Sequence, residues 1–221
     1  MSQPIVIASL AYKGTKHKGR GTGRPALKAL LKYFQYRDRE NNRRARAHRI
    51  ERWQDHGLGR HYSEILRQCE ALQSKHVLAW TWVISPAPDL MALVPAPERR
   101  DLLCDLTERV VEDYHTARGL DVPEYSFVLH SARTRPKDGE PARDHLHTHV
   151  VLPGTAPSSA ERLPVYNNAD KGHDRLFREV AAQRFAEMLD DRGIDWRRLR
   201  PEPAIPRDDR GEIDLDAYFG R

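Results

Sequence analysis

Three histidines in the segment DHLHTHVVL stand two residues apart, at His145, His147 and His149. Because consecutive side chains of a β-strand point to opposite faces, these imidazoles share one face. His130 ends the preceding apolar segment YSFVLH and comes beside that face if the two strands pair as neighbours. Three neutral imidazoles can bind a divalent metal and leave positions open for water or a phosphate oxygen. The spacing therefore predicts a metal site with ligands His130, His147 and His149; the alternative is a solvated strand face with incidental histidines.

Asp144 directly precedes the histidine strand. It is the candidate to orient one imidazole through its second ring nitrogen, as carboxylates near metal ligands commonly do. Imidazole ligands favour Zn, Ni or Cu over Mg on general grounds. The ligand set thus predicts a divalent metal ion without fixing its identity, and it assigns no role to His145.

The elements that would position these residues alternate between strands and helices. Apolar runs predict strands over residues 4–12, 76–85, 125–131 and 145–152, with a short edge strand over 163–166. Helical spacing of apolar residues predicts a helix with Pro25 in its first turn, helices over 60–73 and 97–118, and a last helix from an Asp170 N-cap to Asp191. No element is assigned to the arginine-rich residues 37–56. This order predicts an α+β fold with a central, mainly antiparallel sheet and helices on one face.

The composition suits a soluble protein with a polyanionic partner. The 221 residues carry 37 Lys and Arg against 32 Asp and Glu, and the basic residues concentrate in 13–24 and 37–52. No apolar run approaches the roughly 18–20 residues that span a bilayer, and the start lacks the features of a signal peptide. Cys69 and Cys104 form no CxxC pair. We therefore expect a cytoplasmic protein without membrane insertion, with one domain over residues 1–194 and a loosely packed tail over 195–221.

Two enzyme families have histidine patterns of this kind. The histidine-triad nucleotide hydrolases carry His-φ-His-φ-His-φ-φ, where φ is apolar, and HLHTHVV resembles it except at Thr148. In that family a histidine attacks the phosphate of a small nucleotide and no metal is needed. In the HUH endonucleases, by contrast, the histidines hold a metal and a tyrosine attacks DNA.

The surrounding segments resemble relaxases, the HUH endonucleases that nick plasmid or T-DNA-type origins, and within them the P-type branch, over residues 24–190. ALKALLKYFQYRD is similar to the family's early helix and has Tyr33 at the place of the nucleophile. TWVISPAPD resembles the family's strand that ends in Ser-Pro, and His130 stands at its isolated first ligand. The family's run of Asp, two residues, His, one residue, His, apolar residues and Gly is matched by Asp144, His147, His149 and Gly154.

The sequence also departs from the family's pattern. The loop between His130 and Asp144 is longer than usual, and His145 is an additional histidine. Leu146 stands where the family often has Pro, and Thr148 stands where it usually has an apolar residue.

The resemblance implies a HUH-endonuclease (relaxase) palm and a site- and strand-specific DNA nickase. Tyr33 would attack a phosphodiester of single-stranded or origin DNA and form a 5′-phosphotyrosine, in plasmid or mobile-element transfer. The resemblance implies Mg or Mn as the working ion. Because imidazole ligands also suit Zn and Ni, we expect a site that accepts several divalent ions. Accessory relaxosome proteins are possible further partners.

Basic residues of the N-terminal third are the candidates for contacts with the DNA backbone. They are Arg20, Arg24, Lys32, Arg37, Arg39, Arg43, Arg44 and Arg46. The alternative for the arginine-rich part is a solvated helix face paired with Asp38, Glu40 and Glu51.

Several alternatives stay open on the sequence. Tyr36 lies one turn beyond Tyr33 and is the reserve nucleophile. Tyr166 would take that role in a rolling-circle replication initiator, in which the tyrosine follows the histidines. The remaining alternatives are a histidine-triad-type nucleotide hydrolase and an inactive HUH fold that binds DNA without cutting it.

Overall fold

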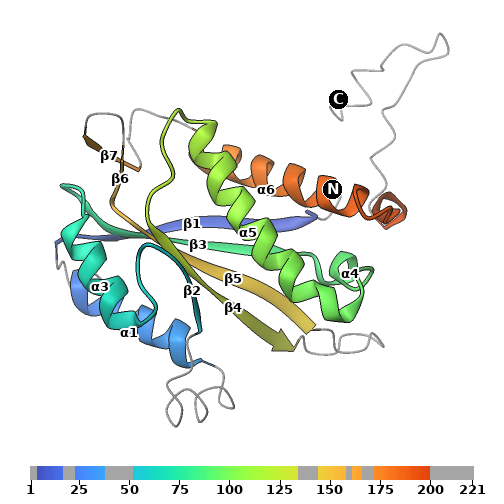
Figure 1. Ribbon diagram of the computed structural model, residues 1–221, viewed down its shortest axis with the longest axis horizontal. Coiled ribbons are helices and arrows are strands. Elements are labelled where there is room, and N and C mark those ends of the chain that lie inside the picture. The colour runs from blue at the N-terminus through green and yellow to red at the C-terminus, as the bar shows by residue number, and fades with distance from the viewer. Residues whose placement is uncertain are drawn as a thin grey trace, which may run out of the picture.

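A five-stranded antiparallel sheet with the strand order β1-β3-β5-β4-β2 forms the centre of the computed structural model (Figure 1). The structure describes residues 4–16, 23–37, 52–133, 144–157, 161–165 and 172–199. The strands are β1 (Val6–Gly14), β2 (Trp53–His56), β3 (Val77–Pro86), β4 (Tyr125–Arg133) and β5 (Asp144–Pro153). The expected antiparallel sheet is confirmed, and the histidine strand β5 lies at its middle.

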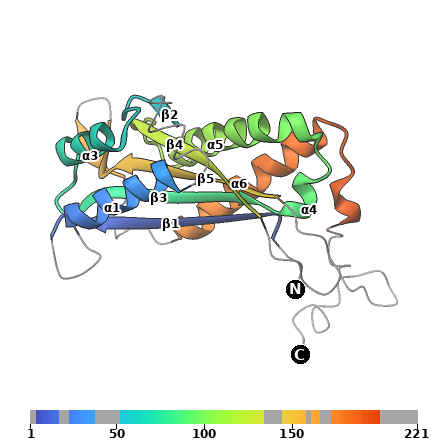
Figure 2. The same ribbon diagram turned by 90° about the horizontal axis from the view of Figure 1, so that it is seen from below.

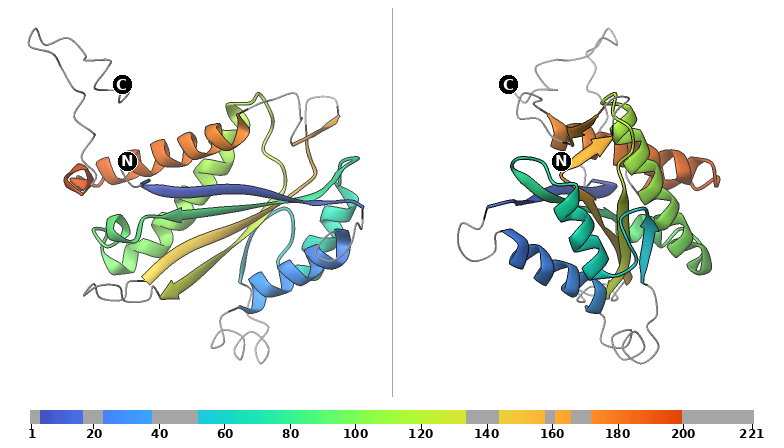
Figure 3. Two further views of the ribbon diagram at one scale, coloured as in Figure 1. Left: turned by 180° about the vertical axis from the view of Figure 1, so that it is seen from behind. Right: turned by 60° about the vertical axis from the view of Figure 1, so that its left-hand side comes forward.

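Helices cover both faces of the sheet, so the expectation of helices on one face is wrong (Figure 3). On one side lie α1 (Gly23–Tyr36) and α3 (Tyr62–Ala71). On the other lie α4 (Pro88–Met91), α5 (Arg99–Thr116) and α6 (His173–Asp190). The physical reason is that β3 and β5 bury side chains on both faces, and both faces of a buried strand need an apolar cover.

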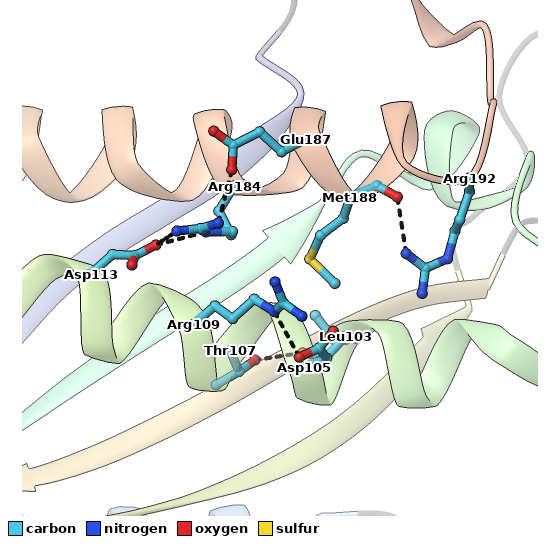
Figure 4. Close-up of polar contacts among 9 residues, drawn as sticks. All are labelled: Leu103, Asp105, Thr107, Arg109, Asp113, Arg184, Glu187, Met188 and Arg192. Atoms are coloured by element: carbon cyan, nitrogen blue, oxygen red, sulfur yellow. Dashed lines mark hydrogen bonds and ion pairs between the residues drawn. The ribbon is translucent and has the colours of Figure 1, made fainter.

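The larger core lies between the sheet and α5 with α6. Trp82 is buried between Tyr114 of α5 and Phe177 of α6, with ring centroids 5.1 and 4.8 Å away. Arg184 of α6 forms an ion pair with Asp113 of α5 at 2.6 Å, which fixes the two helices side by side (Figure 4). Trp80 belongs to the same core, and the exposures of Trp80 and Trp82 are 6% and 1%.

A smaller core lies between the sheet and α1 with α3. Leu27, Leu31 and Phe34 are buried on one side of α1, as their three- and four-residue spacing predicts. Trp53 of β2 joins this core and donates its indole N–H to Gln35 Oε1 at 3.3 Å. These contacts hold α1 against the sheet beside the histidine strand; Figure 2 shows α1 and α3 over one end of the strands.

Gly154 follows β5 where the chain passes close to the start of β3. A Cβ at this position would lie 2.1 Å from the carbonyl oxygen of Val77 and 2.5 Å from the amide of Ser74. No side chain fits there, which gives the glycine after the histidine strand a packing reason.

Four local features differ from the sequence expectations or extend them. The last helix begins at His173 with Gly172, at φ 94°, as its N-cap, so the assignment of Asp170 as N-cap is wrong. The sequence analysis assigned no strand to β2. Of the small pair β6 (Thr155–Pro157) and β7 (Arg162–Pro164), it predicted only a strand near β7, over residues 163–166. Beyond residue 194 a 3-10 helix, Trp196–Arg198, continues the packed chain, and residues 200–221 lie outside the described part. No helix in the described ranges is both long and apolar enough to cross a membrane.

Candidate metal centre

The register of β4 and β5 brings three histidines together on the α1 side of the sheet. His130 stands directly opposite His147, and His149 lies opposite Val128 one step further along. One nitrogen from each of His130, His147 and His149 lies within 4.8 Å of the other two. The same alternation points Leu146, Thr148 and Val150 into the opposite side of the sheet, where all three are buried. The geometry is therefore a compact set of three nitrogen donors from two neighbouring strands.

Backbone carbonyls fix the tautomers of two of these rings. His130 Nε2 lies 2.7 Å from the carbonyl oxygen of Phe34, and His147 Nδ1 lies 3.2 Å from that of His145. A carbonyl oxygen only accepts, so each of these ring nitrogens donates its N–H. In a neutral imidazole the other nitrogen then carries the lone pair. His130 Nδ1 and His147 Nε2 are thus the two nitrogens that could ligate a metal ion, and two backbone carbonyls orient these rings.

His149 completes the donor set. Its ring stacks on that of Phe34, with centroids 4.1 Å apart and 17° between the planes. Both of its nitrogens are buried and have no hydrogen-bond partner among the described residues. Burial, together with the neighbouring His130 and His147, lowers the pKa of His149 to about 3, so the ring stays neutral. A buried, neutral imidazole without a partner fits a metal ion, which would satisfy one of those nitrogens.

Arg37 lies beside the same ring nitrogens of His130 and His147. Its Nη1 is 2.9 Å from His147 Nε2 and 3.4 Å from His130 Nδ1. The guanidinium carbon also lies 5.7 Å from the centre of the Tyr33 ring. Arg37, expected to contact DNA, therefore bridges the histidines and the predicted nucleophile.

The two tyrosines of α1 have different surroundings. Tyr33 is 51% exposed and turns away from the buried side of the helix. Tyr36 is partly buried, and its hydroxyl lies 3.5 Å from His61 Nε2. His61 in turn lies 2.7 Å, through Nδ1, from Ser63 Oγ. Tyr33 is the more accessible of the two phenols.

The remaining expected site residues divide into described and undescribed ones. Arg24 forms an ion pair with Glu70 of α3, and the Lys32 ammonium lies 5.2 Å from the centre of the Tyr62 ring. Other expected positions lie outside the described residues: Arg20, Arg39, Arg43, Arg44, Arg46 and Tyr166. The backbone of Asp144 begins β5, while its side chain is likewise outside the described part.

Two side chains of neighbouring elements contact His145 and Thr148, the two polar departures from the family pattern. Ser85, from the expected Ser-Pro strand end, lies with its hydroxyl 2.6 Å from His145 Nε2. Thr107 of α5 lies with its hydroxyl 2.9 Å from that of Thr148. The sequence analysis noted Ser85 as a strand end but predicted neither its contact with His145 nor the contacts of Thr107 and Phe34.

The fold is similar to that of solved relaxase structures, so the expected resemblance is confirmed at the level of the fold. The solved structures that match include the conjugative relaxase TrwC with a 27-mer DNA comprising the recognition hairpin and the cleavage site, at 16% identity and a TM-score of 0.52, over 85% of this chain and 70% of that one. TrwC in complex with oriT DNA matches in its metal-bound form at 14% identity and a TM-score of 0.55, over 94% of this chain and 75% of that one. Its copper-bound form matches over the same shares at 13% identity and a TM-score of 0.53. No family model and no curated protein matches the sequence.

Proposed function

We propose that the protein is a relaxase: a metal-dependent transesterase that cuts one DNA strand at a specific site and keeps the 5′ end as a phosphotyrosine, in plasmid or mobile-element transfer. The observation that carries the proposal is the cluster of His130, His147 and His149 in the fold of TrwC, whose structures contain oriT DNA and, in two forms, a bound metal. An exposed tyrosine on the helix that packs on this cluster adds the group that the chemistry needs.

The three histidines would hold the divalent ion through His130 Nδ1, His147 Nε2 and one nitrogen of His149. A bound ion there would neutralise charge on the non-bridging oxygens of the scissile phosphate. We infer Mg or Mn as the working ion from the resemblance to relaxases, while the nitrogen donors also suit Zn or Ni. The chain's own contribution is to keep the His149 ring neutral and to fix the tautomers and orientations of His130 and His147.

Tyr33 is the proposed nucleophile. In the step, the phenol loses its proton and its oxygen forms a bond to phosphorus. The bond from phosphorus to the 3′ oxygen breaks, and that oxygen takes up a proton and leaves as a hydroxyl. The phosphotyrosine retains the ester linkage, so attack by a 3′ hydroxyl reverses the reaction. The exposure of Tyr33 lets a polymer reach it, whereas Tyr36 is partly buried beside His61.

A strip of the sheet that runs from the exposed part of β1 to the histidines is the proposed place of the single strand. Ser9 of β1, Val83 of β3 and His149 of β5 follow one another across the strands. Ser9 is exposed, and Ile7, which shares its face of β1, is 56% exposed. Arg24 and Lys32 on α1 would add phosphate contacts that do not depend on the base sequence.

The test is incubation of the protein and Mn²⁺ with a library of single-stranded origin sequences, followed by a search for a covalent protein–DNA adduct. We expect an adduct that Tyr33→Phe eliminates, and that Tyr36→Phe and Tyr166→Phe retain. Peptide mapping by mass spectrometry checks the attachment independently, and a DNA-linked peptide without residues 29–37 contradicts the assignment.

Other outcomes of the same experiment identify the other candidates. Loss of the adduct with Tyr166→Phe alone indicates a rolling-circle initiator. DNA binding without any adduct indicates an inactive HUH fold. Consumption of small nucleoside phosphoramidates without DNA cleavage indicates a histidine-triad-type hydrolase.

A further inference from the structure

Arg37 uses the same ring nitrogens that the candidate metal site offers. One guanidinium nitrogen, Nη1, lies 2.9 Å from His147 Nε2 and 3.4 Å from His130 Nδ1. The opposite nitrogens of these rings face carbonyl oxygens, at 3.2 Å for His147 and 2.7 Å for His130. The nitrogens that face Arg37 are therefore the two that carry lone pairs.

A lone pair accepts a hydrogen bond from an N–H group or binds a metal ion, but not both. The guanidinium of Arg37 and a divalent ion therefore exclude each other at His130 Nδ1 and His147 Nε2. Arg37 leaves these atoms by rotation of its side chain, which starts directly after the end of α1 at Tyr36. The guanidinium carbon already lies 5.7 Å from the centre of the exposed Tyr33 ring. Tyr33 therefore lies next to the position that the rotated side chain would take.

We propose that Arg37 is a positioning residue that alternates with the divalent ion. It occupies the ligand nitrogens of His130 and His147 until the ion binds, and it is then displaced toward Tyr33. The first half of this inference needs only the metal site. The second half rests on the proposed function, because the displaced guanidinium is useful there only if a phosphate anion arrives beside Tyr33.

The charge of the displaced group fits that second role. Arginine carries five N–H donors in a planar fork that matches a phosphate group. When the ion takes the two histidine nitrogens, the donors of Arg37 become available to a non-bridging oxygen at the nucleophile. Binding of the metal would thus both complete the histidine site and place a second cation at the reacting phosphate.

The first test is calorimetric titration of the chelator-stripped protein with Mn²⁺ and with Zn²⁺, without DNA. Removal of a competitor that makes two hydrogen bonds should tighten the binding of both ions about tenfold in Arg37→Ala. Lys28→Ala is the matched control, since it removes one exposed positive charge from α1, the helix that precedes Arg37. This variant should keep the affinity within about twofold of the wild type. Arg37→Lys keeps the charge but loses the fork, so an affinity equal to that of the wild type would assign the effect to charge alone and overturn the competition.

The second test follows the side chain itself by nitrogen-15 NMR of the guanidinium groups, with the Arg37 signal assigned by its loss in Arg37→Lys. A guanidinium bonded to two histidines should rotate slowly about its C–N bonds. Saturation with diamagnetic Zn²⁺ should bring it to the faster rotation of an exposed arginine. Slow rotation that persists at saturating Zn²⁺ overturns the displacement.

These measurements separate the failure of this inference from that of the proposed function. If His147→Ala abolishes Zn²⁺ binding while Arg37→Ala leaves the affinity unchanged, the metal site stands and the competition is wrong. If the wild-type protein binds neither ion, the metal site and this inference fail together.

Discussion

The ring of Phe34 stacks on the ring of His149, with the two centroids 4.1 Å apart. The carbonyl oxygen of Phe34 also accepts a hydrogen bond from His130 Nε2 at 2.7 Å. A single residue at the end of α1 therefore contacts two of the three candidate ligands, one through its side chain and one through its backbone. The position of α1 on the sheet and the geometry of the site depend on each other.

Phe34→Leu tests the side-chain half of this relationship. The carbonyl that holds His130 remains, but His149 loses its stacking partner, so we expect the affinity for Zn²⁺ to fall about tenfold. The free energy of unfolding should drop by about 1 kcal/mol, as for a moderate core substitution. Calorimetry and thermal melting measure the two quantities. Phe177→Leu in the core under α6 is the control; an equal loss of affinity in both variants would refer the effect to general loosening of the fold.

His149→Leu should make the chelator-treated protein more stable while it destroys the metal site. Both ring nitrogens of His149 are buried without a hydrogen-bond partner among the described residues, and such groups cost about 1–3 kcal/mol when they leave water. An apolar side chain removes that cost, so we expect the free energy of unfolding to rise by about 1–2 kcal/mol. Denaturant unfolding in the presence of a chelator measures it. His76→Leu, at an exposed position, should stay within about 0.5 kcal/mol of the wild type; a destabilised His149→Leu would contradict the prediction.

The hydroxyl pair of Thr107 and Thr148 should show an asymmetric double-mutant cycle. Thr107 donates to the carbonyl oxygen of Leu103 at 2.7 Å, so it accepts from Thr148 across the 2.9 Å contact. Thr107→Val leaves the Thr148 hydroxyl buried without its acceptor and should cost about 1–3 kcal/mol. Thr148→Val leaves the donated bond of Thr107 intact and should cost less. The double variant should be more stable than the sum of the two losses indicates; strict additivity would show that the pair does not interact.

His115 should make stability depend on pH. Burial lowers the pKa of His115 to about 4 from its usual 6.5. Between these values the unfolded chain binds a proton that the folded protein excludes, so folding loses stability as the pH falls from 6.5 toward 4. We expect His115 to account for a loss of about 2 kcal/mol between pH 7 and 4.5.

The measurement compares the wild type with His115→Phe, which keeps a ring against Trp82 and removes the titrating group. Denaturant unfolding of both proteins at several pH values isolates this histidine, because all other titrating groups are shared. Parallel stability curves for the two proteins would contradict the assignment.

The sequence by itself determined which residues share one face of a strand or of a helix. Side chains alternate along a strand with a period of two, so the spacing of His147 and His149 was enough to place them on one face, and the apolar run over residues 76–85 was enough to predict a strand. The helical spacing of Leu27, Leu31 and Phe34 likewise set the buried side of α1. These are properties of neighbouring residues and depend on local geometry alone.

Only the tertiary structure decided what lies opposite that face. The register that puts His130 against His147 depends on how two strands align across a long loop. The hydrogen bond from His130 to Phe34 joins residues 96 positions apart, and that from Arg37 to His147 joins residues 110 positions apart. No local period encodes such distances, because they follow from the packing of α1 on a sheet that forms from the whole chain. The metal-ligand candidates could thus be read from the spacing of residues, whereas their tautomers, their stacking partner and their competing cation could not.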